Sequence, residues 1–162
     1  MTEDDVTRLA RRLGRACKKR DVDVVTAESC TGGGVANACT RISGSSEWFE
    51  RGMVTYTNVA KREMLGVSEE TLEAHGAVSE EVAREMAAGA LQHSHADVSV
   101  AVTGIAGPGG GVPGKPVGTV HFAWGVRGGP VQARRFLFKG DRAAVRLQSV
   151  AVALQGLIDL LR

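Results

Sequence analysis

The stretch DVDVVTAESCTGGGV, residues 21–35, decides the fold of this chain. Its β-branched first part predicts a strand over residues 21–26. Three consecutive glycines then predict a tight turn, and helical spacing of apolar residues resumes over residues 35–42. A strand that passes directly into a helix through such a turn is a building block of α/β folds.

The rest of the chain extends this pattern in both directions. Amphipathic helices are predicted over residues 3–19 and at the C-terminal end, where the apolar positions are Leu147, Ala151, Leu154, Ile158 and Leu161. Ser68 and Ser79 are expected to cap two further helices, and a short helix is expected over 60–65. Strands are predicted over 49–57, 97–103, 117–126 and 131–138, the last two as a hairpin.

Alternating strands and helices followed by a hairpin predict an α/β fold, a three-layer α/β/α sandwich around a mixed sheet. The length of 162 residues predicts one domain, 1–162.

Charge and composition narrow the function classes. A net charge of +2 and an aromatic content of 4 % argue against a nucleic-acid surface. The basic run at 11–20 carries apolar residues at helical spacing, so the solvated face of a helix is favoured over a nucleic-acid patch.

Three cysteines without a CxxC motif fit a reducing compartment, and the acidic N-terminus does not resemble a signal peptide. No run approaches 18 apolar residues. The expected location is therefore the cytoplasm, with no membrane span.

Ser29 lies where the predicted strand turns into the predicted helix. Unpaired backbone N–H groups at a helix start can stabilise an oxyanion, and glycine lets a substrate approach closely. The expected donors are the N–H groups of Cys30, Thr31, Gly32 and Gly33. Two alternatives stay open at this point: Ser29 or Thr31 caps the helix, or Cys30 is the nucleophile instead.

A nucleophilic serine needs a base. None of the four histidines has a convincing local context, and the pair His93 and His95 lacks further ligands, so no metal site is expected. Lys61 begins a helix directly after a strand whose end can lie beside Ser29. A buried lysine with a lowered pKa can act as a base, although a surface lysine is the ordinary case.

A second glycine-rich segment, TGIAGPGGG at 103–111, follows the end of a predicted strand, where open α/β sheets bind ligands. Its Walker A-like continuation to Lys115 fails because Pro116 replaces the required hydroxyl residue. A flexible surface loop is the alternative. Arg142 or Arg146, near the start of the last helix, is a candidate phosphate contact.

These residues converge on a family. The chain resembles the CinA C-terminal domain family, the nicotinamide-nucleotide amidohydrolases. The matching motifs occur in family order and cover nearly the whole chain: AESCTGG (27–33), GSS (44–46), TYTNVAK (55–61), GAVS (76–79), VTGIAGP (102–108), KPVGTV (115–120) and FKGDRAAVR (138–146).

The resemblance implies hydrolysis of the carboxamide of nicotinamide mononucleotide to nicotinate mononucleotide and ammonia, with no cofactor. It implies that Ser29 is the nucleophile, Lys61 the base and Tyr56 a supporting residue. Thr103 and the loop 104–111, with Gly104 and Gly107, would line the site, and Arg142 would contact the phosphate. The chain departs from many relatives at GPGGG, where an Asp or Asn often follows the proline, and at Thr57, where Ser is common.

Two other functions remain alternatives: an amidase for another carboxamide, and a non-catalytic binding module linked to competence or DNA damage. The family also leads us to expect a homodimer. A surface of small residues is expected to pack closely on a second helix, in the same chain or in another; it comprises Ala83, Ala87, Gly89 and Ala90.

Overall fold

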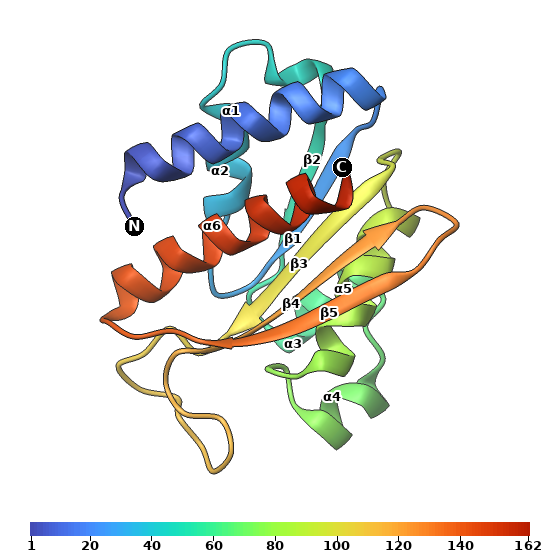
Figure 1. Ribbon diagram of the computed structural model, residues 1–162. Coiled ribbons are helices and arrows are strands. Elements are labelled where there is room, and N and C mark those ends of the chain that lie inside the picture. Colours follow the sequence, from blue (N-terminus) through green and yellow to red (C-terminus); the bar gives the residue numbers. More distant parts are fainter.

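A five-stranded mixed sheet forms the centre of the computed structural model, which describes residues 1–162 (Figure 1). The strand order is β2-β1-β3-β4-β5. The strands are β1 (Val24–Glu28), β2 (Phe49–Val54), β3 (Val98–Gly104), β4 (Thr119–Val126) and β5 (Val131–Leu137).

The first three strands in the chain are parallel, whereas β4 and β5 continue the sheet antiparallel as a hairpin. The carboxyl ends of β1, β2 and β3 therefore meet at one edge, and the segments that follow these strands emerge there together.

Six α-helices cover the two faces of the sheet (Figure 1). One face carries α1 (Glu3–Arg20), α2 (Gly34–Thr40) and α6 (Arg142–Leu160). The other carries α3 (Asn58–Leu65), α4 (Glu69–His75) and α5 (Glu80–Gln92). A short 3₁₀ helix, η1 (Ser45–Glu47), precedes β2. The predicted three-layer α/β/α sandwich around a mixed sheet is confirmed.

Successive residues of β1 contribute to opposite cores, as expected of a strand covered on both faces. Val24 belongs to a cluster of 25 buried residues beneath α1, α2 and α6, and Val25 to a cluster of 15 beneath α5. The strand begins at Val24, later than the predicted residue 21, because Asp21 ends α1 in a left-handed conformation. It also extends through Ala27 and Glu28, beyond the predicted end.

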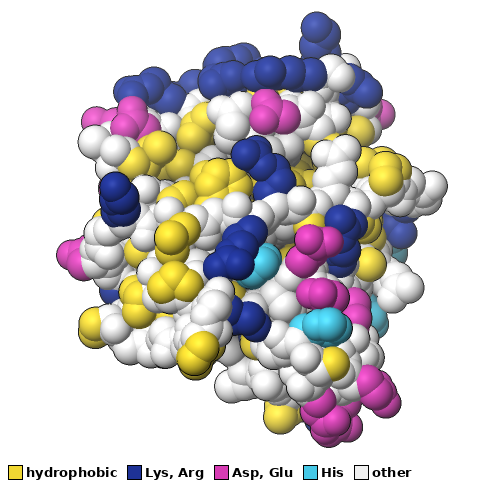
Figure 2. All heavy atoms as spheres, turned by 60° about the horizontal axis from the view of Figure 1, so that its bottom comes forward, with side chains coloured by type: hydrophobic (Ala, Val, Ile, Leu, Met, Phe, Trp, Pro, Cys, Tyr) yellow, Lys and Arg dark blue, Asp and Glu magenta, His cyan; other side chains and the backbone are white.

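The basic run lies on α1, which buries Leu13 and Cys17 and leaves its Lys and Arg side chains largely in solvent. Figure 2 shows a row of basic side chains along the edge that α1 occupies. By length and composition alone, α6 could cross a membrane. It packs against α1 and the sheet, however, so its apolar residues form core.

The small-residue surface of α5 packs within the same chain. A Cβ placed on Gly89 would stand 1.8 Å from the carbonyl oxygen of Leu65, the last residue of α3. Glycine at this position lets the two helices approach. The small-residue surface therefore packs on a helix of the same chain.

Candidate active site

A pocket of about 280 Å³ opens where the segments after β1, β2 and β3 meet. Ser29 and Cys30 come from the first segment, Tyr56 from the second and Gly104 from the end of β3. The other lining residues are Asn58, Lys61, Ala77, Val78, Thr103, Ile105, Ala106, Gly107, Gly109, Gly110 and Arg142.

Ser29 and Lys61 meet inside this pocket. The Nζ atom of Lys61 lies 3.0 Å from the Oγ atom of Ser29, within hydrogen-bond distance. Parallel pairing of β1 with β2 creates this contact, because it places the residue after Glu28 beside the segment that leads into α3. The two residues that the sequence analysis expects to act as nucleophile and base therefore lie in contact.

Lys61 is almost fully enclosed, with 1 % of its surface exposed. Its amine donates to the backbone carbonyls of Thr55, at 3.1 Å, and Tyr56, at 3.4 Å. Burial lowers the pKa of Lys61 from its ordinary value of 10.5, because desolvation penalises the charged amine. The neutral amine that a general base requires is thus favoured by the fold.

Neither Ser29 nor Thr31 caps α2, so that interpretation of the turn is wrong. The cap residue is Gly33, which has no side chain to offer. The N–H groups of Val35 and Ala36 instead donate to the carboxylate of Glu28, at 2.8 and 2.9 Å. Nothing in the local sequence indicates this role of Glu28, because the donors at the helix start are backbone groups.

The turn itself keeps several backbone N–H groups unpaired. Those of Cys30, Thr31 and Gly33 make no hydrogen bond within the protein, whereas that of Gly32 donates to the carbonyl of Ser29. Thr31, Gly32 and Gly33 line a second hollow of about 530 Å³. Of the residues in this turn, only Ser29 and Cys30 line the pocket that contains Lys61.

Arg142 crosses the mouth of the pocket. Its guanidinium donates to the carbonyl of Gly107 and to the hydroxyl of Tyr56, each at 2.9 Å. Arg146 points to the glycine turn and donates to the carbonyls of Cys30 and Thr31, each at 3.2 Å. Of the two arginines, only Arg142 lines the pocket with Ser29.

The segment after β3 forms the opposite wall. Thr103 is buried, and its hydroxyl donates to the carbonyl of Ala77 at 2.8 Å, which joins β3 to the segment before α5. A Cβ on Gly104 would stand 2.7 Å from Val120, and Gly107 has a positive φ of 83°. Glycine at 104 therefore allows close packing against Val120, and glycine at 107 allows a left-handed backbone conformation.

Sequence reasoning missed three lining residues: Asn58, Ala77 and Val78. Asn58 stands within the TYTNVAK motif and starts α3, so the motif was the available signal. Ala77 and Val78 carry no chemical signal, because they line the pocket only through the packing of the segment between α4 and α5.

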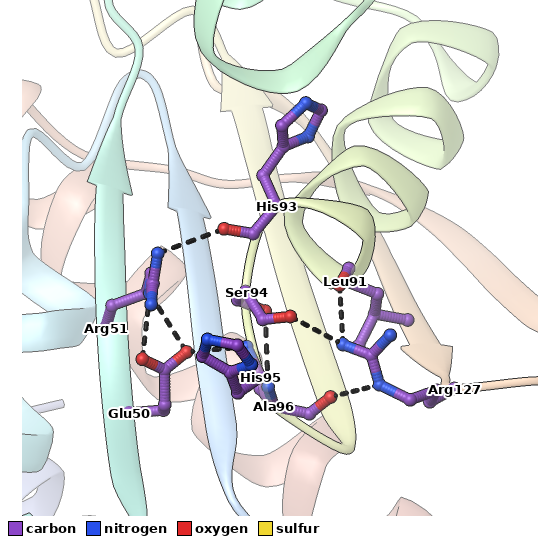
Figure 3. Close-up of polar contacts among 8 residues, drawn as sticks. All are labelled: Glu50, Arg51, Leu91, His93, Ser94, His95, Ala96 and Arg127. Atoms are coloured by element: carbon purple, nitrogen blue, oxygen red, sulfur yellow. Dashed lines mark hydrogen bonds and ion pairs between the residues drawn. The ribbon is translucent and has the colours of Figure 1, made fainter.

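The histidine pair lies away from this pocket, in the turn between α5 and β3. Figure 3 shows the rings of His93 and His95 pointing in different directions. The turn is held by Arg51, which donates to the carbonyl of His93, and by Arg127, which donates to the carbonyls of Ser94 and Ala96. No group of three or more potential metal ligands occurs in the structure.

Cys30 stands beside the Ser29–Lys61 pair but is poorly suited to replace Ser29. Burial raises the pKa of its thiol to about 12, which favours the less nucleophilic protonated form. All three cysteines are buried free thiols.

Comparisons with known proteins agree with the motifs. Residues 6–161 match the CinA C-terminal domain. The chain is 56 % identical to nicotinamide-nucleotide amidohydrolase PncC of Escherichia coli strain K12 over 157 residues, which cover 97 % of this chain and 95 % of that protein. It is 54 % identical to a protein of the same name from Pseudomonas putida, with 97 % and 98 % coverage.

Solved structures extend the similarity to three dimensions. Competence/damage inducible protein CihA from Agrobacterium tumefaciens matches with a TM-score of 0.95 and 51 % identity, over 98 % of this chain and 96 % of that one. Sequence and structure thus agree over nearly the whole length, and the chain belongs to the CinA C-terminal domain family.

Proposed function

We propose that this protein is an amidohydrolase that converts nicotinamide mononucleotide to nicotinate mononucleotide and ammonia. The observation that carries the proposal is the Ser29–Lys61 contact of 3.0 Å within the pocket. The names of the PncC relatives, which are 54–56 % identical over nearly their full length, support the reaction and the substrate.

Acylation begins with proton transfer from Ser29 to Lys61. A neutral amine has two hydrogens and one lone pair. The carbonyls of Thr55 and Tyr56 can accept the two hydrogens, which leaves the lone pair of Lys61 directed at the Ser29 hydroxyl. The Ser29 oxygen then attacks the amide carbon and forms a tetrahedral intermediate.

The negative charge of that intermediate needs hydrogen-bond donors. The unpaired N–H group of Cys30, which lines the pocket beside Ser29, is the proposed donor, whereas Thr31, expected from the sequence as a second donor, lines the neighbouring hollow. Lys61 returns the proton to the amide nitrogen, the carbon–nitrogen bond breaks, and ammonia leaves. Water, deprotonated by Lys61, then attacks the carbonyl carbon of the Ser29 ester. The bond between that carbon and the Ser29 oxygen breaks, Lys61 returns the proton to Ser29, and nicotinate mononucleotide leaves.

Arg142 is the proposed phosphate contact. Its guanidinium lines the pocket and is held in place by Gly107 and Tyr56. A guanidinium presents five donors, so it can bind phosphate oxygens while keeping part of this support. Thr103, Gly104 and Gly107 form the wall against which the substrate would lie. The proposed steps use neither a metal ion nor a cofactor.

The buried free thiols support a reducing, cytoplasmic location. The homodimer implied by the family remains a prediction, and light scattering of the purified protein tests it.

The experiment is a substrate panel of nicotinamide, its riboside and its mononucleotide, with ammonia and the acid product measured together. We expect the mononucleotide to be strongly preferred. Preference for the phosphate-free compounds would favour a different carboxamide as substrate. Absence of hydrolysis, together with salt-dependent DNA binding, would favour the binding-module alternative.

A further inference from the structure

Glu28 is a fully buried carboxylate with 0 % exposure, one residue before Ser29. Oε1 accepts hydrogen bonds from the Thr31 hydroxyl at 2.6 Å and from the Val35 N–H at 2.8 Å. Oε2 accepts from the Ala36 N–H at 2.9 Å and from the Thr26 hydroxyl at 3.4 Å. In all four contacts the carboxylate oxygens are the acceptors.

These contacts join the two ends of the glycine turn. Glu28 ends β1, whereas Val35 and Ala36 lie in the first turn of α2. The segment between them includes three consecutive glycines, Gly32–Gly34, which have no side chains to restrict the backbone. The carboxylate supplies the restriction: it ties the start of the helix to the end of the strand, with Ser29 between them.

The backbone of Glu28 makes a second connection, toward the base. Its carbonyl accepts the N–H of Thr55 at 2.7 Å, and the carbonyl of Thr55 accepts the amine of Lys61 at 3.1 Å. The N–H of Ser29 itself donates to the carbonyl of Val102 at 3.0 Å. One residue therefore contacts both the segment that carries the nucleophile and the segment that orients the amine.

The carboxylate pairs two N–H groups at the helix start and none in the turn. It occupies the N–H groups of Val35 and Ala36 at the helix start, whereas those of Cys30 and Thr31 in the turn stay unpaired. A buried charge without an ion-pair partner is costly to desolvate, and an apolar side chain would fill the space without that cost. Unlike an apolar side chain, the carboxylate accepts hydrogen bonds from the Thr31 hydroxyl and from the helix start at the same time.

We propose that Glu28 is a positioning residue of the hydrolysis, which holds the turn so that Ser29 faces Lys61 and the Cys30 N–H group faces the developing oxyanion. This inference rests on the proposed function. Glu28 does not touch the substrate; it acts through the turn.

The decisive variant is Glu28→Gln, which preserves shape but places an NH₂ group against the N–H donors. We expect kcat to fall about 10- to 100-fold, the range that a small misplacement of reacting groups produces. KM should change by less than about threefold, because the pocket walls and Arg142 remain in place. Amide hydrogen exchange at Val35 and Ala36 should become faster.

A second pair keeps the test independent of how Glu28→Gln folds. Thr31→Val removes the hydroxyl that donates to Glu28, and Thr31→Ser retains it. We expect Thr31→Ser to be faster than Thr31→Val by roughly tenfold in kcat, because only Thr31→Ser keeps the hydroxyl that donates to Glu28. Equal kcat in the two variants would overturn the proposal.

Ser99→Ala is the matched control, because the buried Ser99 hydroxyl makes a single hydrogen bond, to Ala87 of α5, away from the pocket. It should lower the melting temperature without changing kcat. Glu28→Gln with wild-type kcat, or with a kcat loss equal to that of Ser99→Ala, would overturn the positioning role. A wild-type protein that releases no ammonia would instead overturn the proposed function, and exchange at Val35 and Ala36 would still report whether Glu28 holds the turn.

Discussion

The hydroxyl of Tyr56 accepts a hydrogen bond from Arg142 at 2.9 Å, although 86 residues separate the two in the chain. Arg142 also donates to Gly107, so one side chain of α6 joins the segments that follow β2 and β3. Tyr56 is 58 % exposed, which places this junction at the entrance of the pocket rather than in its interior.

The first prediction concerns Arg142. Arg142→Gln removes the charge and should raise KM for the mononucleotide by about tenfold or more, the effect of losing one charge-assisted hydrogen bond of about 1.5–3 kcal/mol. Steady-state kinetics with the mononucleotide and the riboside provide the measurement. Hydrolysis of the riboside should change little, because it has no phosphate.

Tyr56→Phe is the matched control for this prediction. It removes the bond to Arg142 but retains the ring and the positive charge. A KM increase as large as that of Arg142→Gln would show that the junction, and not the charge, determines binding.

The second prediction concerns the pH dependence of catalysis. Burial lowers the pKa of Lys61, and the base must be neutral. The rate should therefore fall as pH falls through this lowered pKa, and it should already be high at a pH below the ordinary 10.5 of lysine. A pH profile of kcat/KM tests this, and a rate that climbs only near 10.5 would contradict it.

The third prediction links the same group to stability. Because the pKa of Lys61 is lower in the folded protein, the unfolded chain binds more protons between the two pKa values. The free energy of unfolding should rise with pH across that window. Lys61→Met lacks this contribution, so the wild type should gain stability relative to Lys61→Met as pH rises toward 10.5. Urea titrations at several pH values measure the difference, and parallel curves would count against the lowered pKa.

The fold was predictable because periodic burial leaves a strong pattern. The buried side of α1 and the caps at Ser68 and Ser79 follow from local spacing and from local hydrogen-bonding chemistry. The boundaries of β1 were less predictable, since its start depends on the left-handed Asp21 and its end on the burial of Glu28.

The candidate site was predictable only where local sequence carries the signal. Ser29 and Lys61 stand in local contexts that suggest chemistry, but their contact depends on the pairing of β1 with β2. The role of Glu28 could not be inferred locally, because its partners Val35 and Ala36 are backbone groups. The separate positions of Arg142 and Arg146 depend on the angle of α6 relative to the glycine turn.

The most direct test of the account is ammonia release from nicotinamide mononucleotide by the wild type and by Ser29→Ala, measured with Ser99→Ala as a folded control. We expect the wild type and Ser99→Ala each to release ammonia and nicotinate mononucleotide in equal amounts. We expect a rate at least about 10³-fold lower from Ser29→Ala, because no nucleophile remains to form the acyl-enzyme. A Ser29→Ala protein that hydrolyses the mononucleotide at a rate close to that of the wild type would contradict the account.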